Sequence, residues 1–211
     1  MSQGTQAKAK PDRRRSGRTL ALAVPPDVRL RVSDDDFWRL AQENPDLRLE
    51  RSAQGELLVM PPAGPDGSQR NMTLGAQLWN WNRKSGLGIA FDSSAGFTLP
   101  NSAIRGPDAS WMTRERWERI PRSERLKFSH VCPDFVAELR SPCNNMKVLR
   151  EKMREYQSQG ARLGWLIDPS DGTVEIYRPN RPVEMLHRPA TLSGEDVLPG
   201  FVLDLKGILF D

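Results

Sequence analysis

The chain has 211 residues, with 31 basic and 27 acidic side chains that give a formal net charge of +4. This length suits one domain with a substantial core, and nowhere do about 18 apolar residues follow one another, as a membrane-spanning helix would require. Two cysteines are too few for a disulfide framework, and no apolar segment follows the first charges. We therefore expect a cytoplasmic protein with no membrane association.

The positive charge is concentrated at the start of the chain. Residues 1–20 hold six of the 31 basic and one of the 27 acidic side chains, which leaves 25 basic and 26 acidic ones in the other 191 residues. Basic ends of this kind bind phosphate in some proteins and are merely solvated in others. We interpret residues 1–24 as a disordered basic tail and residues 25–211 as one domain.

The first predicted elements of the domain are a short helix and a hairpin. Ser33, followed three residues later by Asp36, is typical of a capping box, and the helix that it begins should end before Pro45. Extended runs at 46–51 and 56–60 are joined by a Ser-Ala-Gln-Gly segment, which indicates a hairpin.

A long helix and several strands are predicted next. After a glycine-rich loop at 61–67, the spacing of Leu74, Leu78 and Trp81 predicts a helix over 68–84. We expect strands at 87–91, 96–99, 108–112, 133–140, 163–167 and 173–178, with a charged excursion at 113–130 and a helix at 146–159 that Gly160 ends. The alternation of the last strand suits an outer position in the sheet. Interleaved strands and helices, with hairpins at both ends, predict an α/β fold with a mixed sheet.

Two acidic residues stand in apolar strands. Asp108 opens one strand after Gly106 and Pro107, and Glu138 lies inside another strand. A glutamate among apolar neighbours is costly to bury unless it is paired or ligates a metal. Hydrolysis of a phosphodiester uses a hard cation held by carboxylates, so Asp108 and Glu138 are candidate ligands for Mg²⁺ or Mn²⁺.

A second Pro-Asp pair, Pro133-Asp134, offers a competing first acid. Asp134 and Glu138 share one strand, and four residues at about 3.3 Å each separate them by about 13 Å. Two ligands of one Mg²⁺ each lie about 2.1 Å from it, so this spacing is too long. Asp108, on another strand, can pair laterally with Glu138. The alternative for Asp108 is a turn residue that opens its strand.

Helix geometry selects the candidate lysine. Lys152 lies within the apolar stripe that Leu149, Met153 and Tyr156 form, whereas Lys147 projects about 160° from Leu149, towards solvent. A lysine in the stripe can place its ammonium at a buried carboxylate. The alternative is a lysine that merely extends to the edge of the core.

The same residues carry a family resemblance. Seven segments occur in order: 47–50, 55–62, 107–110, 133–142, Lys152, Tyr156 and 160–169. Over roughly residues 33–205 the chain resembles the Uma family, a bacterial branch of the PD-(D/E)XK nuclease superfamily. The resemblance implies a restriction-endonuclease-like core, in which helices flank a central mixed sheet and the metal site lies at a split in that sheet. It also implies that Asp108 and Glu138 are the acids of the motif.

The resemblance bears on three further positions. The superfamily's lysine usually stands two residues after the second acid, where this chain has Arg140, which is a poor general base. Uma members similarly lack that lysine and offer one from the following helix, which corresponds to Lys152. Glu50 matches an acidic position that joins the site in the family. The alternative interpretation is that Glu50 is a polar residue on the outer face of its strand, with Leu47 and Leu49 facing inward.

Other chemistries fit less well. His130 and His187 stand apart from any serine or carboxylate pattern, and neither a zinc pattern nor a phosphate loop occurs. The sequence therefore predicts an endonuclease that hydrolyses DNA with Mg²⁺ or Mn²⁺, with Asp108, Glu138, Lys152 and Glu50 as its site. The alternative is a nuclease-fold module that binds nucleic acid or a protein without turnover, because the body lacks the positive charge usual in DNA binders. Whether the chain acts as a monomer or a homodimer is left open.

Overall fold

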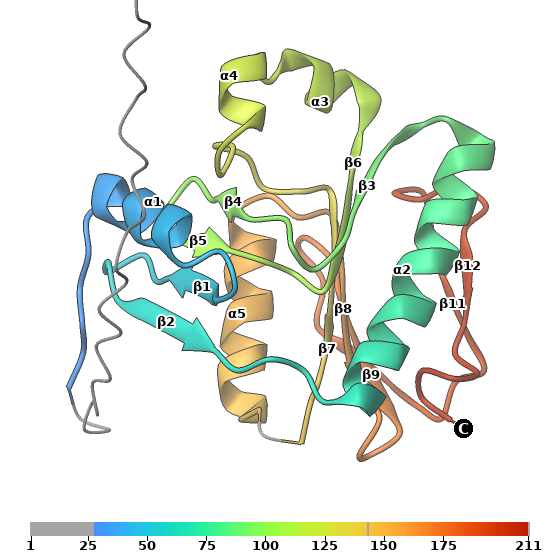
Figure 1. Ribbon diagram of the computed structural model, residues 1–211. Helices are drawn as coiled ribbons and strands as arrows, with labels where there is room; N and C mark the ends of the chain where they lie inside the picture. Colours follow the sequence, from blue (N-terminus) through green and yellow to red (C-terminus); the bar gives the residue numbers. More distant parts are fainter. Residues whose placement is uncertain (1–27, 143, 211) are drawn as a thin grey trace, which may run out of the picture.

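The computed structural model describes residues 28–142 and 144–210 of the chain (Figure 1). The basic tail predicted at residues 1–24 and the domain boundary at residue 25 lie outside these ranges. Within them, no helix is long and apolar enough to cross a membrane.

A six-stranded mixed sheet forms the centre of the fold. Its strand order is β10-β9-β8-β7-β6-β3. The strands are β3 (Gly88–Phe91), β6 (Ala109–Thr113), β7 (Phe135–Leu139), β8 (Leu163–Asp168), β9 (Thr173–Tyr177) and β10 (Glu184–His187). β7 and β8 are parallel, and the other neighbouring pairs are antiparallel, so the mixed sheet is confirmed. The parallel pair needs a crossover connection, which α5 (Met146–Ser158) supplies.

A smaller four-stranded sheet lies beside α5 (Figure 1). Its order is β2-β1-β5-β4, with β1 (Arg48–Arg51), β2 (Leu57–Met60), β4 (Phe97–Thr98) and β5 (Ile104–Arg105). β1 and β2 are the predicted hairpin. β5 was not predicted, because two residues show no periodicity. The chain leaves β5 through Gly106 and Pro107 and enters β6 of the central sheet directly after Asp108. A two-stranded ladder of β11 (Thr191–Ser193) and β12 (Val202–Asp204) completes the strands described.

The residues at the helix N-termini explain where α1 and α2 begin. In α1 (Asp34–Glu43), the Ser33 hydroxyl accepts a hydrogen bond from the Asp36 backbone N–H, as the capping box predicted. The Asp36 carboxylate accepts from the Ser33 hydroxyl and not from the Ser33 backbone N–H that a full capping box uses. α2 (Pro65–Ser85) begins three residues earlier than predicted, so part of the glycine cluster is helical. A proline in the first turn loses no helical hydrogen bond, which explains this start. The charged excursion contains α3 (Arg114–Arg119) and α4 (Arg122–Arg125).

The two faces of the central sheet carry separate cores. α2 and the β11-β12 ladder lie on one side and α5 on the other (Figure 1). Phe135 and Ala137 of β7 belong to the core on the α2 side, whereas Val136 packs with Leu149 and Met153 of α5. Because side chains alternate along a strand, Glu138 shares the α5 side with Val136.

The prediction that β9 is an outer strand is wrong, because β10 pairs with it on the side opposite β8. The alternation has another origin. Val174 and Ile176 pack in the core on the α2 side, whereas Glu175 on the opposite face is buried in an ion pair with Arg150 of α5, at 2.6 Å. The polar residue at this alternate position is therefore a buried carboxylate paired with a partly exposed arginine, and its face of the strand is not exposed to solvent.

The close packing of β3 on β6 generates a prediction for Gly88. A Cβ at this position would lie 2.1 Å from the Met112 carbonyl oxygen and 2.4 Å from the Trp111 ring. We expect Gly88→Ala to lower the free energy of unfolding by about 1–3 kcal/mol, the usual cost of overpacking. Gly75 of α2 has no neighbour within 4 Å of such a Cβ, so Gly75→Ala should raise stability by about 0.5–1 kcal/mol. Denaturant unfolding followed by circular dichroism compares them, and equal stability of the two variants would contradict the packing described.

Candidate active site

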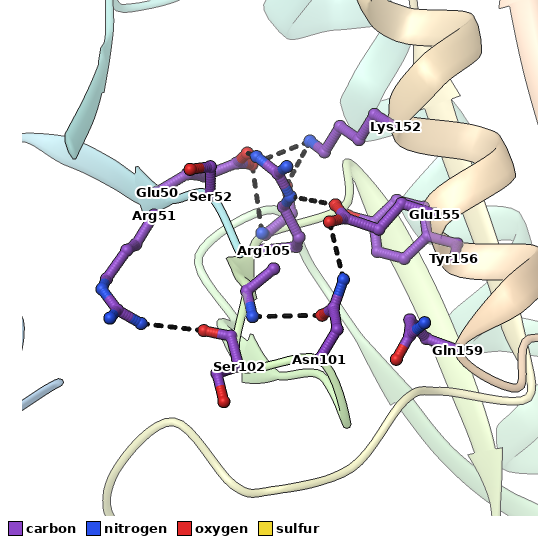
Figure 2. Close-up of polar contacts among 12 residues, drawn as sticks. Glu50, Arg51, Ser52, Asn101, Ser102, Arg105, Lys152, Glu155, Tyr156 and Gln159 are labelled. Carbon is purple, nitrogen blue, oxygen red and sulfur yellow. Dashed lines mark hydrogen bonds and ion pairs between the residues drawn. The ribbon is translucent and has the colours of Figure 1, made fainter. Parts of the chain in front are cut away.

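A lysine lies between two buried glutamates. Glu50, in β1 of the smaller sheet, is 2 % exposed, and Glu138, in β7 of the central sheet, is 3 % exposed. The Lys152 ammonium on α5 lies 2.7 Å from Oε1 of each. Figure 2 shows the lysine side chain reaching from the helix towards Glu50. Buried charges are costly unless paired, so these three side chains compensate one another across the two sheets.

The position of Lys152 follows from the amphipathic pattern of α5. Leu149, Met153 and Tyr156 are buried, and Lys152 is buried with them in one stripe. Lys147 is exposed, as the helical spacing predicted. Asn145 caps the start of the helix, and its side chain accepts a hydrogen bond from the Lys147 N–H at 2.9 Å.

Asp108 lies next to Glu138, directly before the start of the neighbouring strand β6. Ala109 pairs with Ala137 in the β6–β7 register, which places the two acids side by side where the strands separate. Asp108 Oδ2 accepts a hydrogen bond from the Leu139 N–H at 2.8 Å. The structure therefore brings Asp108, Glu138, Lys152 and Glu50 together.

Two arginines that the sequence interpretation did not select complete this cluster. Arg48 of β1 donates from one guanidinium nitrogen to Asp108 Oδ1 at 3.0 Å and from the other to the Gly106 carbonyl at 2.6 Å. Arg105 of β5 contacts Glu50 Oε2 at 3.3 Å. The sequence did indicate that Arg48 lies near the site. Residues two apart on a strand share a face, so the Arg48 and Glu50 side chains lie on the same side of β1.

A second layer of hydrogen bonds supports Arg105. Its Nε donates to Glu155 of α5 at 2.6 Å, and the Asn101 side chain donates to the other oxygen of that carboxylate at 2.9 Å (Figure 2). Arg105 thus connects Glu50 to α5 by a route separate from Lys152.

The environments of the two glutamates separate their pKa values. Burial raises the pKa of Glu138 to about 7, a shift that Lys152 opposes and that the charges of Asp108 and Glu50 reinforce. Burial also acts to raise the pKa of Glu50, but the charges of Lys152 and Arg105 more than offset it and hold that pKa below its ordinary value. Glu50 is therefore ionised at neutral pH, whereas Glu138 exchanges a proton near it.

Lys152 acts as a cation in this setting. Burial alone would lower the pKa of its amine, but the adjacent Glu138 and Glu50 carboxylates raise it above the ordinary value. The Tyr156 hydroxyl donates to Glu138 Oε1 at 3.2 Å, and burial raises the pKa of this phenol well above its usual range. Lys152 is thus charged and Tyr156 neutral at physiological pH.

The competing residues have partners of their own. Asp134, before the start of β7, pairs with Arg116 of the α3 segment at 2.7 Å and accepts from the Thr113 N–H at 2.9 Å. Arg140 pairs with Asp168 at the end of β8, at 2.6 Å. The alternative interpretation of Glu50 as an outward-facing residue is wrong, since Glu50 is buried while Leu47 is 49 % exposed.

The donor set fits a hard divalent cation. Asp108 and Glu138 offer carboxylate oxygens from adjacent strands, and Mg²⁺ is commonly held by one or two carboxylates with water and substrate phosphate completing its shell. The second oxygen of Glu138 has no hydrogen-bond partner among the residues described. Within the same residues, no group of three or more His, Cys, Asp and Glu side chains is arranged to hold a metal ion. A metal here would therefore depend on the two strand carboxylates and on ligands from solvent or substrate.

Comparison with known proteins bears on this site. A family model, Uma2, described as "Putative restriction endonuclease", matches residues 34–206. The chain belongs to the Uma2 family. The matched range includes Glu50, Asp108, Glu138 and Lys152, together with both arginines of the cluster. Curated protein sequences give no match.

A solved structure shares the fold of this Uma2 member. It is described as a "putative nuclease belonging to DUF820" from Anabaena variabilis ATCC 29413. The two structures align with a TM-score of 0.65 at 22 % sequence identity, over 76 % of this chain and 89 % of that one. A mixed sheet flanked by helices is therefore the architecture of a solved nuclease-like protein.

The ion bridge generates a prediction about stability. We expect Lys152→Met to lower the free energy of unfolding by about 3–5 kcal/mol near neutral pH, because it leaves two buried carboxylates without their shared partner. Adding Glu138→Gln should restore part of this loss. Lys147→Met, on the exposed start of α5, should change stability by less than about 0.5 kcal/mol. Chemical denaturation measures all three, and indistinguishable lysine variants would be incompatible with the bridge.

Proposed function

We propose that this Uma2 protein is a metal-dependent endonuclease that hydrolyses DNA phosphodiester bonds with Mg²⁺ or Mn²⁺. The observation that carries the proposal is the buried Lys152 ammonium, held by Glu50 and Glu138 beside Asp108. Family membership supports a nuclease, and the spatial cluster supports an active one, since it combines carboxylates that can hold a metal ion with an ammonium that can stabilise developing negative charge.

In this proposal Asp108 and Glu138 hold the metal ion. When bound, such an ion lowers the pKa of a coordinated water and neutralises developing negative charge. The backbone of β7 fixes Asp108 through the Leu139 N–H, and the Tyr156 hydroxyl orients Glu138. The protein thus supplies two carboxylates held rigidly by strand pairing and by a buried phenol.

Lys152 supplies positive charge and not a base. Its raised pKa keeps the amine protonated, so the ammonium can orient an attacking water and stabilise the charge that develops on the phosphate. Glu50 holds this ammonium in place from the opposite sheet, at 2.7 Å, and remains ionised to do so. Glu50 is in this sense a positioning residue.

One observation favours a second function. Lys152 is paired with two carboxylates, Asp108 accepts bonds at both of its oxygens, and the nearby arginines are themselves in ion pairs. A nuclease-fold module that binds nucleic acid or a protein without turnover would have such a closed, self-compensated site. The activity measurements below separate the two functions.

Cleavage of supercoiled plasmid in Mg²⁺ or Mn²⁺ tests the nuclease proposal. We expect Lys152→Ala to lower the single-turnover rate by about a hundredfold or more, the usual effect of removing a positioned electrostatic group. Lys147→Ala, on the same helix but exposed, should retain the wild-type rate. Each variant is first checked for folding by circular dichroism. Full activity in folded Lys152→Ala, or no metal-dependent cleavage by the wild type, would reject the assignment.

Calorimetric titration with Mn²⁺ tests the metal ligands separately from turnover. We expect Asp108→Ala and Glu138→Ala to abolish measurable binding, because each removes one of two carboxylate ligands. Asp134→Asn is the matched control, since this acid is equally buried but pairs with Arg116. Its affinity for Mn²⁺ should equal that of the wild type. Unchanged binding in both alanine variants would remove the metal site.

A further inference from the structure

The charges of the cluster are nearly balanced without any metal ion. Within the described residues, four acids and three bases meet: Glu50, Asp108, Glu138 and Glu155 with Arg48, Arg105 and Lys152. Adding a divalent cation would place two further positive charges, and so an excess of positive charge, in a region where the Glu50, Asp108 and Glu138 carboxylates are at least nine-tenths buried. Uncompensated charge in such surroundings is costly. Metal binding to these residues is therefore easiest if one of the bases withdraws.

Arg48 is the base best placed to withdraw. Its side chain is 33 % exposed, whereas that of Arg105 is 12 % and that of Lys152 is 9 % exposed. Arg105 and Lys152 are each held by two carboxylates, whereas Arg48 forms an ion pair with Asp108 alone within the described part of the chain. Arg48 can thus reach water with the smallest loss of ion pairing.

The contacts of Arg48 support this choice. Its guanidinium occupies Asp108 Oδ1, the oxygen that the β7 backbone leaves available. Its Nε is buried and has no hydrogen-bond partner among the described residues. A buried unsatisfied donor costs free energy, which is recovered when the group reaches solvent. This cost partly offsets what Arg48 gains from its ion pair with Asp108 and from its hydrogen bond to the Gly106 carbonyl.

We propose that Arg48 holds the place of the metal ion on Asp108 and leaves this carboxylate when the ion binds. The inference rests on the proposed metal-dependent function. The affinity of the site for metal is then the outcome of an exchange between a guanidinium and a divalent cation. Without metal, Arg48 keeps Asp108 compensated and the two sheets together.

Calorimetric titration of the whole chain with Mn²⁺ tests the exchange. Arg48→Met should bind Mn²⁺ about tenfold or more tightly than the wild type, since the ion no longer displaces a charge-assisted hydrogen bond. Arg105→Gln is the matched control: it removes the same charge from the cluster but leaves Arg48 on Asp108. A much smaller gain in Arg105→Gln than in Arg48→Met supports exchange. An equal increase in affinity for Mn²⁺ in the two variants would show that only the overall charge of the cluster matters, and it would overturn the exchange.

A direct readout follows the arginine itself. The Arg48 Nε–H resonance, identified by its loss in Arg48→Lys, should shift and exchange faster with water when Mg²⁺ saturates the wild type. An unchanged resonance in the metal-bound protein would overturn the inference, as would equal or weaker Mn²⁺ binding by Arg48→Met. Such results, with Mn²⁺ still bound by the wild type, leave the proposed function intact. If neither the wild type nor Arg48→Met binds metal, the proposed function fails together with the inference.

Discussion

A protonated lysine between two buried glutamates is the interaction on which the site depends. Glu50 belongs to the smaller sheet and Glu138 to the central one, and Lys152 reaches both from the helix between them. Without this ammonium, the two sheets would bring carboxylates together in surroundings where charge is poorly solvated. The arrangement of β1, α5 and β7 therefore requires a cation at this position, whether or not catalysis occurs.

Gly106 is the backbone element around which these side chains are arranged. Its N–H donates to Glu50 Oε1 at 3.1 Å, and its carbonyl accepts from Arg48 at 2.6 Å and from Lys152 at 3.4 Å. A Cβ here would lie 3.2 Å from the Ala95 carbonyl oxygen, so a side chain would press this loop against its neighbour. The chain crosses from the smaller sheet to the central sheet at this glycine. Its backbone N–H and carbonyl thus orient one acid, Glu50, and two bases, Arg48 and Lys152, close to Asp108.

The parts of the fold that the sequence predicted are those encoded locally. The stripe on α5 needs only helical spacing, and it correctly separated buried Lys152 from exposed Lys147. Glu138 stood out because its neighbours in β7 are apolar and buried. The capping box at Ser33 and the β1–β2 hairpin likewise depend on a few adjacent residues. In each case the physical signal lies within one turn of a helix or a few strand residues.

The rest depends on pairing between distant segments. β5 has two residues, and it is a strand because it lies between β4 and β1 and pairs with both, although β1 is more than 50 positions earlier in the chain. Arg105 carries no local signal of burial, since an arginine on a short strand is ordinarily solvent-exposed. Arg48 shares a strand face with Glu50, but the local sequence does not show what that face packs against. Each is partly buried because a carboxylate from another element faces it. Hydrophobic periodicity identifies which face of an element is buried, but an ion pair is defined by two elements at once. The sum of charges along residues 21–211 is close to zero, but this sum does not show where the charges lie. Three of the cations are gathered on four of the acids at the candidate site.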